Sequence, residues 1–284
     1  MASGADSPRA TRVTPAGAGA LACLLLLVLT GFVALTGSRV RAADESVLRG
    51  FRLLDRGWAD DLLSAVAHLA DPPLYLLATA GLIGVALRVR QRPRLAIGVA
   101  ALLGGSAVTT QLLKHALAQP RLVDWLGASQ VGNASWPSGH ATAAMALALA
   151  GVLVAGRGRR RWAAVVGGVF AGAVGTAVLA LAWHFPSDVL GGFLVAAVWA
   201  LGVLAVLEVV DPAQRALTWG DARLVAAALG ALAGLGLLAA GLALALRSAG
   251  ALDSLAAPAR LGGAAVVAGA AAALPLALSR AVDG

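Results

Sequence analysis

Residues 114–188 contain three short polar segments in an otherwise apolar stretch: KHALAQPR (114–121), PSGH (137–140) and HFPSD (184–188). Between them, and on both sides, the sequence consists almost wholly of Ala, Leu, Val and Gly. The only lysine of the chain, Lys114, lies in the first segment, and of the 4 histidines only His68 lies outside all three. Because Lys and His are so rare elsewhere, their concentration here predicts a chemical site.

The composition predicts an all-α integral membrane protein. The 284 residues are 60% hydrophobic and 13% charged, with a mean hydropathy of +0.84, whereas soluble domains carry about 25% charged residues. Runs of about 20 apolar residues are long enough to cross a bilayer. The net charge of +8 comes from arginine clusters between apolar segments, which is typical of membrane orientation signals and argues against nucleic-acid binding. A single cysteine, Cys23, excludes an intrachain disulfide and a thiolate metal cluster.

We predict about eight membrane-spanning helices. A six-span catalytic core occupies residues 16–210 and a two-span extension occupies 211–284, after a disordered cytoplasmic tail over 1–15. A cleaved signal peptide is the alternative for 16–36, although the run is long for one and a retained anchor is favoured. Within the polar segment 37–73, the stretch 46–73 is expected to form an amphipathic helix that lies at the interface or caps the bundle. The expected spans are 16–36, 74–87, 95–118, 138–155, 162–183, 186–210, 222–246 and 261–278.

Arginine distribution predicts the orientation of these spans. Loops 88–94 and 157–161 hold four arginines each, whereas loop 119–137 holds only Arg121. Cytoplasmic loops are enriched in Lys and Arg, so the first two loops are expected inside and the third outside. We therefore expect a multi-pass protein of the cell membrane with all three polar segments at its outer face.

The first two segments contain groups suited to binding phosphate. Ser138 is expected to cap the fourth span, whose free N–H groups and helix dipole form an anion site at Ser138 and Gly139. Gly139 has no Cβ to obstruct an approaching oxyanion. Lys114 supplies a point charge and Arg121 a planar fork, and both suit phosphate oxygens.

The histidines point to phosphoryl transfer. Asp188 follows His184 by four residues, so its carboxylate can reach one ring nitrogen and leave the other free as a nucleophile. His140 is the candidate general acid for the leaving oxygen, whereas His68 is expected to pack. Cationic groups and two histidines, without a cysteine or carboxylate cluster, indicate metal-free transfer through a phosphohistidine with no cofactor.

These residues resemble the pattern of the type 2 phosphatidic acid phosphatase (PAP2) family, which shares its core with vanadium haloperoxidases. That pattern is K-x6-R-P, then P-S-G-H, then S-R-x5-H-x3-D. The second part matches in full. The first part departs at Leu122, where the family has proline, and the third lacks its Ser-Arg pair, which is Ala177 and Val178 here. The matching site residues are Lys114, Arg121, Ser138, Gly139, His140, His184 and Asp188.

The resemblance implies a lipid phosphatase. It implies a substrate such as an isoprenyl or glycerolipid phosphate or diphosphate, with undecaprenyl diphosphate among the candidates. In the family, the arginine that Val178 replaces grips the transferring phosphoryl group. The alternative is therefore a catalytically weak or inactive homologue that binds anionic lipid headgroups or a partner protein. The sequence does not indicate an oligomeric state.

Overall fold

The protein is described here by a computed structural model that covers residues 14–52, 58–127, 131–210, 269–271, 273–276 and 278–279. Every regular element in these ranges is a helix, so the predicted all-α fold class is confirmed. The elements are α1 (Pro15–Thr36), α2 (Ser38–Arg52), α3 (Trp58–His68), α4 (Pro72–Gly84), η1 (Val85–Val89), α5 (Pro93–Ala116), η2 (Asp124–Leu126), α6 (Gly139–Val154), η3 (Arg157–Arg159), α7 (Arg160–Ala180) and α8 (Pro186–Val210).

Six apolar helical segments correspond to the first six predicted spans. Five are long and apolar enough to cross a membrane: α1, the continuous segment Pro72–Val89, α5, α7 and α8. The sixth, α6, is equally apolar but shorter, at 16 residues. Proline stands in the first turn of α1, α4 and α5, where its missing N–H costs no helical hydrogen bond.

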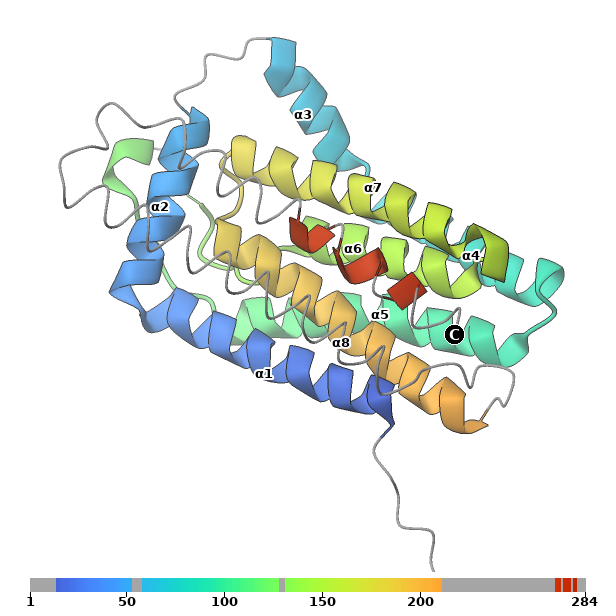
Figure 1. Ribbon diagram of the computed structural model, residues 1–284. Helices are drawn as coiled ribbons and strands as arrows, with labels where there is room; N and C mark the ends of the chain where they lie inside the picture. Colours follow the sequence, from blue (N-terminus) through green and yellow to red (C-terminus); the bar gives the residue numbers. More distant parts are fainter. Residues whose placement is uncertain are drawn as a thin grey trace, which may run out of the picture.

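Helix α8 lies at the centre of the bundle and packs against α1, α5 and α6, while α6 also contacts α5 and α7 (Figure 1). Large apolar side chains point away from the bundle on its outer helices, such as Phe32 on α1, Leu77 on α4 and Val169 on α7. Exposed apolar faces of this extent are unfavourable in water and favourable in lipid.

The segment 37–73, predicted to contain one amphipathic helix over 46–73, forms two helices that are separated by residues outside the described ranges. Helix α2 crosses one end of the bundle (Figure 1) and contacts α1, α7 and α8, while α3 packs on α7. The tail over 1–13, the seventh span and most of the eighth lie outside the described residues. Of the eighth span, Ala270, Ala271 and Leu274 pack into the main apolar core.

A close approach between α8 and the start of α6 joins the second and third polar segments. The N–H of Ser138 donates to the carbonyl oxygen of Asp188 at 2.8 Å. A Cβ added to Gly192 would lie 2.6 Å from the carbonyl oxygen of Ser138 and 2.9 Å from the backbone nitrogen of Thr142. Only glycine therefore allows α8 to approach this turn so closely.

We predict that Gly192→Ala lowers the stability of the protein. Overpacking against fixed backbone atoms costs about 1–3 kcal/mol, which outweighs the gain in helix propensity of about 1 kcal/mol. The measurement is the midpoint of thermal unfolding in detergent. Gly202→Ala on the same helix is the matched control, because nothing lies within 4 Å of its added Cβ. Equal midpoints for the two variants would contradict the prediction.

Candidate functional site

His184 is presented by a tight turn at the C-terminal end of α7. The N–H of Trp183 donates to the carbonyl of Val178 and the N–H of Ala182 to that of Leu179, at 2.9 and 3.0 Å. These bonds, with Ala182 at φ 57°, form a Schellman cap in which glycine is the usual residue. The N–H of His184 also donates to the carbonyl of Val178, at 3.3 Å. The cap therefore fixes the backbone of His184 at the end of the bundle.

Asp188, fully buried in the first turn of α8, connects this turn to the rest of the site. Its Oδ2 accepts the N–H of Phe185 at 2.9 Å and lies 3.5 Å from Nδ1 of His184. That distance suits an ion pair and is long for a hydrogen bond. The geometry orients Nδ1 toward the carboxylate and leaves Nε2 as the nitrogen available for a reaction.

Arg121 is buried against two carboxylates. Its Nη1 donates to Oδ1 of Asp188 at 2.6 Å, and its Nη2 donates to Oδ2 of Asp44 at 2.7 Å. The guanidinium also lies 4.0 Å over the ring of Phe185. Its Nε is buried and has no hydrogen-bond partner among the described residues. The planar fork of Arg121, which the sequence predicts to bind phosphate, thus binds carboxylates through both terminal nitrogens, and Nε is its nitrogen without a partner among the described residues.

Asp44, on α2, is a site residue that sequence reasoning missed. Its Oδ1 accepts the N–H of Ser187 at 3.1 Å, and its Oδ2 accepts the hydroxyl of Ser187 at 2.5 Å. Burial raises the pKa of the Asp44 carboxyl to about 6, while the Arg121 guanidinium acts in the opposite direction. No local pattern distinguishes Asp44 from the other charged residues of the segment 38–52, because its role depends on how α2 crosses the bundle.

The start of α6 has the predicted cap. Ser138 is the N-cap residue, and its hydroxyl accepts the N–H of Ala141 at 3.3 Å. Its own N–H, which we expected to be free for an anion, is bonded to Asp188. The N–H groups of Gly139 and His140 have no partner among the described residues, so the anion site shifts to them. Cε of Lys114 lies 3.9 Å from the position of a Gly139 Cβ, which places the lysine over this helix end.

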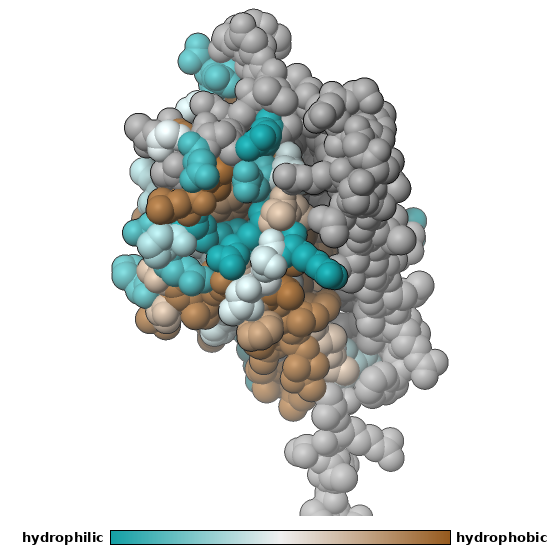
Figure 2. All heavy atoms as spheres, turned by 90° about the vertical axis from the view of Figure 1, so that its left-hand side faces the viewer, coloured by the Kyte–Doolittle hydropathy of each residue, from teal (hydrophilic) through white to brown (hydrophobic). Residues whose placement is uncertain are grey.

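His140 faces His184 across the site, with 6.4 Å between ring centroids. Both rings lie at the end of the bundle where α2 crosses, and hydrophilic residues gather on this end (Figure 2). His184 is nearly buried, whereas 27% of the His140 side chain is exposed. A phosphoryl group between the rings could meet a nucleophile on one side and an acid on the other.

Val178 is fully buried in the main apolar core. The position where the family pattern has its arginine therefore supplies no charge, and its backbone carbonyl serves the cap before His184 instead. The sequence suggested Arg52, Arg56 or Arg260 as replacements. Arg56 and Arg260, and the side chain of Arg52, lie outside the described residues.

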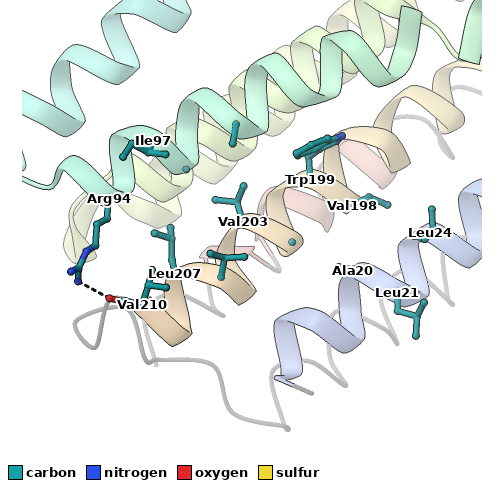
Figure 3. A pocket seen from close by; sticks show the side chains of 14 residues that line it. Ala20, Leu21, Leu24, Arg94, Ile97, Val198, Trp199, Val203, Leu207 and Val210 are labelled. Carbon is teal, nitrogen blue, oxygen red and sulfur yellow. Dashed lines mark hydrogen bonds between the residues drawn. The ribbon is translucent and has the colours of Figure 1, made fainter. Parts of the chain in front are cut away.

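A cavity lies elsewhere in the molecule and does not share this chemistry. It has a volume of about 730 Å³, opens between α1, α5 and α8, and is lined by apolar residues such as Leu21, Ile97 and Trp199 (Figure 3). Its one charged lining residue, Arg94, donates to the carbonyl of Val210 at 2.6 Å. The reacting groups lie at the polar end of the bundle, so we place the functional site there.

Comparisons with known proteins identify the family that the chain resembles. Residues 94–210 match the PAP2 superfamily model. The fold is similar to the crystal structure of the first transmembrane PAP2 type phosphatidylglycerolphosphate phosphatase from Bacillus subtilis. The TM-score is 0.55 at 19% identity, over 68% of this chain and 98% of that chain. No curated protein matches. The comparisons confirm the family resemblance and the membrane phosphatase fold.

We predict that Asp44→Ala destabilises the protein by about 3–5 kcal/mol, because it leaves a buried guanidinium with one carboxylate partner in place of two. The change is measured as a lower midpoint of thermal unfolding in detergent. Glu45→Ala is the control: this neighbouring carboxylate pairs with Arg49 at 3.4 Å on the exposed face of α2, where ion pairs contribute about 0–1 kcal/mol. Similar midpoints for the two variants would show that the Arg121–Asp44 contact is not structurally important.

Proposed function

We propose that this protein, whose residues 94–210 match the PAP2 superfamily model, is a membrane phosphatase. It would hydrolyse a lipid phosphate or diphosphate through a phosphohistidine on His184. The observation that carries the proposal is the placement of His184 beside Asp188 and opposite His140, with 6.4 Å between the histidine rings.

The first step is attack by Nε2 of His184 on phosphorus. A P–N bond forms as the P–O bond to the lipid breaks, and protonated His140 gives its proton to the leaving oxygen. In the second step water attacks phosphorus, the P–N bond breaks, and His140 takes a proton from the water. Inorganic phosphate leaves, and both histidines return to their starting states. The carboxylate of Asp188 stabilises the positive charge on His184 while the phosphohistidine exists.

The phosphate oxygens would be held by few groups. The N–H groups of Gly139 and His140 lie at the positive end of α6, and Lys114 adds a point charge beside them. Arg121 offers its unpaired Nε, since its other two nitrogens already bind Asp44 and Asp188. No metal is required in this scheme.

The substrate class we propose is an isoprenyl or glycerolipid phosphate. Two features support a lipid. Helices α7 and α8, which flank His184, are long and apolar enough to cross a membrane. The site lies at the polar end of the bundle, where a headgroup could bind while its chains stay in the bilayer. The similar phosphatase from Bacillus subtilis is named for phosphatidylglycerol phosphate, which makes that lipid a substrate to test here.

A second candidate is a catalytically weak homologue that binds anionic lipid headgroups or a partner protein. Two observations favour it: Val178 supplies no cation, and both terminal nitrogens of Arg121 are bound to carboxylates. Loss of one charge-assisted donor to a transition state costs about 2.7–4 kcal/mol, or about 10²–10³ in rate. Such an enzyme would still be measurable, so an assay separates the two candidates.

We predict that the purified protein in detergent releases phosphate from at least one lipid of a panel of phosphatidic acid, phosphatidylglycerol phosphate and undecaprenyl diphosphate. His184→Ala is expected to reduce release by at least about a thousandfold, because it removes the nucleophile. His115→Ala is the matched control, since His115 is exposed and, among the described residues, bonds to the carbonyl of Gln111 at 2.7 Å. Equal, slow release by wild type and His184→Ala on every lipid would favour the binding-protein candidate.

We also propose that the site faces the outside of the cell membrane. The arginine-rich loops support this orientation: they lie next to each other, with Nη1 of Arg90 3.3 Å from the position of a Gly156 Cβ. They connect the ends of α4 with α5 and of α6 with α7, opposite to the ends that carry His140 and His184. The concentration of arginine in these two loops indicates the cytoplasmic face.

Cysteine labelling tests this orientation. In a protein whose Cys23 is replaced by alanine, we expect Gly132→Cys to react in intact cells with a thiol reagent that cannot cross membranes, and Gly158→Cys to react only after lysis. Both positions are exposed, with nothing within 4 Å of an added Cβ, so the two cysteines differ chiefly in the face they occupy. The reverse labelling pattern would place the site in the cytoplasm and rule out a substrate in the outer leaflet.

A further inference from the structure

A second histidine–carboxylate pair lies in the site, and its carboxylate comes from outside the three polar segments. Nε2 of His140 donates to Oδ1 of Asp71 at 3.1 Å. Asp71 stands at the turn between α3 and α4, which is 69 positions earlier in the chain. It also precedes the region 94–210 that matches the family model. His140 and His184 therefore each face a carboxylate, and the two pairs face each other across the site.

The other oxygen of Asp71 binds His68. Nδ1 of His68 donates to Oδ2 of Asp71 at 2.8 Å. His68 was expected to pack, but 55% of its side chain is exposed. The ring of Trp183 lies 5.6 Å from that of His68 and 5.5 Å from that of His140, between centroids. Asp71 is thus held by two imidazoles, and both of these contact the residue that precedes His184.

Asp71 is well suited to carry a negative charge in this place. Partial burial acts to raise its pKa, but the hydrogen bonds from His68 and His140 outweigh this effect and hold the pKa of Asp71 below its ordinary value. Although Asp71 is the N-cap residue of α4, its side chain makes no capping hydrogen bond. Its carboxylate therefore serves the histidines and not the helix.

We propose that Asp71 is the positioning residue of His140. Its carboxylate holds Nε2, which orients the imidazole ring so that Nδ1 faces the leaving oxygen. The same carboxylate stabilises the imidazolium form of His140 that acts as the acid. This inference rests on the proposed function. In the first step Nδ1 gives its proton to the leaving oxygen, and Nε2 keeps its proton in the bond to Asp71. In the second step Nδ1 takes a proton from the attacking water, so Asp71 stays ionised throughout the cycle.

The charged and titratable groups that face His140 fix the direction of the effect. Asp71 is the acidic partner, at 3.1 Å. The positive charge of Lys114 on α5, and a positive charge on His184 before α8, would destabilise the imidazolium form of His140. His68 binds the other oxygen of the Asp71 carboxylate. Removing the charge of Asp71 therefore lowers the pKa of His140. As the pH rises, the protonated form that acts as the acid is then lost at a lower pH than in the wild type.

The experiment uses Asp71→Asn in the full-length protein, which keeps the size of the side chain. Two quantities are measured. The first is the pKa of His140, by NMR of ¹⁵N-histidine-labelled protein in detergent micelles, with the signal assigned through its loss in His140→Gln. The second is the pH profile of kcat/KM for phosphate release from the best lipid of the panel, whose basic limb reports the acid in the free enzyme.

We expect Asp71→Asn to lower the pKa of His140 by about one unit and to move the basic limb by a similar amount. Asp71→Glu is expected to restore part of both shifts. The signals of the other histidines report whether the variant is folded. Asp61→Asn is the matched control: this exposed carboxylate in the first turn of α3 should leave both quantities unchanged.

The outcomes separate this inference from the proposed function. An active wild type whose pH profile is the same in Asp71→Asn would overturn the inference alone, as would an unchanged pKa of His140 in the folded variant. A wild type that releases phosphate from none of the lipids would overturn the proposed function and with it the catalytic role of Asp71. In that case the pKa of His140 would still report whether the two side chains interact.

Discussion

The site depends on Asp188, a carboxylate that is fully buried at the N-terminal end of α8. One oxygen binds Arg121, the other accepts the N–H of Phe185 and lies next to His184, and its backbone carbonyl holds the N–H of Ser138. A buried charge is tolerated only when it is paired and hydrogen-bonded, so all these contacts are needed together. They unite the three polar segments, because each segment supplies one of the partners of Asp188.

Burial of Asp188 also determines what Arg121 can do. A guanidinium that neutralises Asp44 and Asp188 has little charge left for a phosphate, and only its Nε is without a partner among the described residues. The site would therefore bind an anion mainly through Lys114 and the end of α6. The hydrophobic core at Val178 offers no substitute, since an arginine there without an anion would cost a few kcal/mol. Under the proposed function, the two histidines would keep their roles, whereas fewer cationic groups would hold the phosphoryl group.

The two histidines have matching environments although they come from different elements. His184 follows the cap of α7 and pairs with Asp188 four residues later, while His140 lies in the first turn of α6 and pairs with Asp71 from the start of α4. The two side chains differ in exposure, which is 27% for His140 and 8% for His184.

The sequence by itself located the first six apolar helical segments and the local contacts around Ser138 and His184. Apolar runs located six helical segments, and the cap at Ser138 and the spacing of His184 and Asp188 followed from short-range rules, because these signals act within a turn or two of helix. Tertiary structure alone decided that Asp44 neutralises Arg121, that the N–H of Ser138 binds Asp188, and that Asp71 pairs with His140. Asp44 and Ser187 are 143 positions apart, and Asp71 and His140 are 69 apart. Contacts at such separations depend on how helices cross, and no local periodicity encodes which of several carboxylates meets which cation.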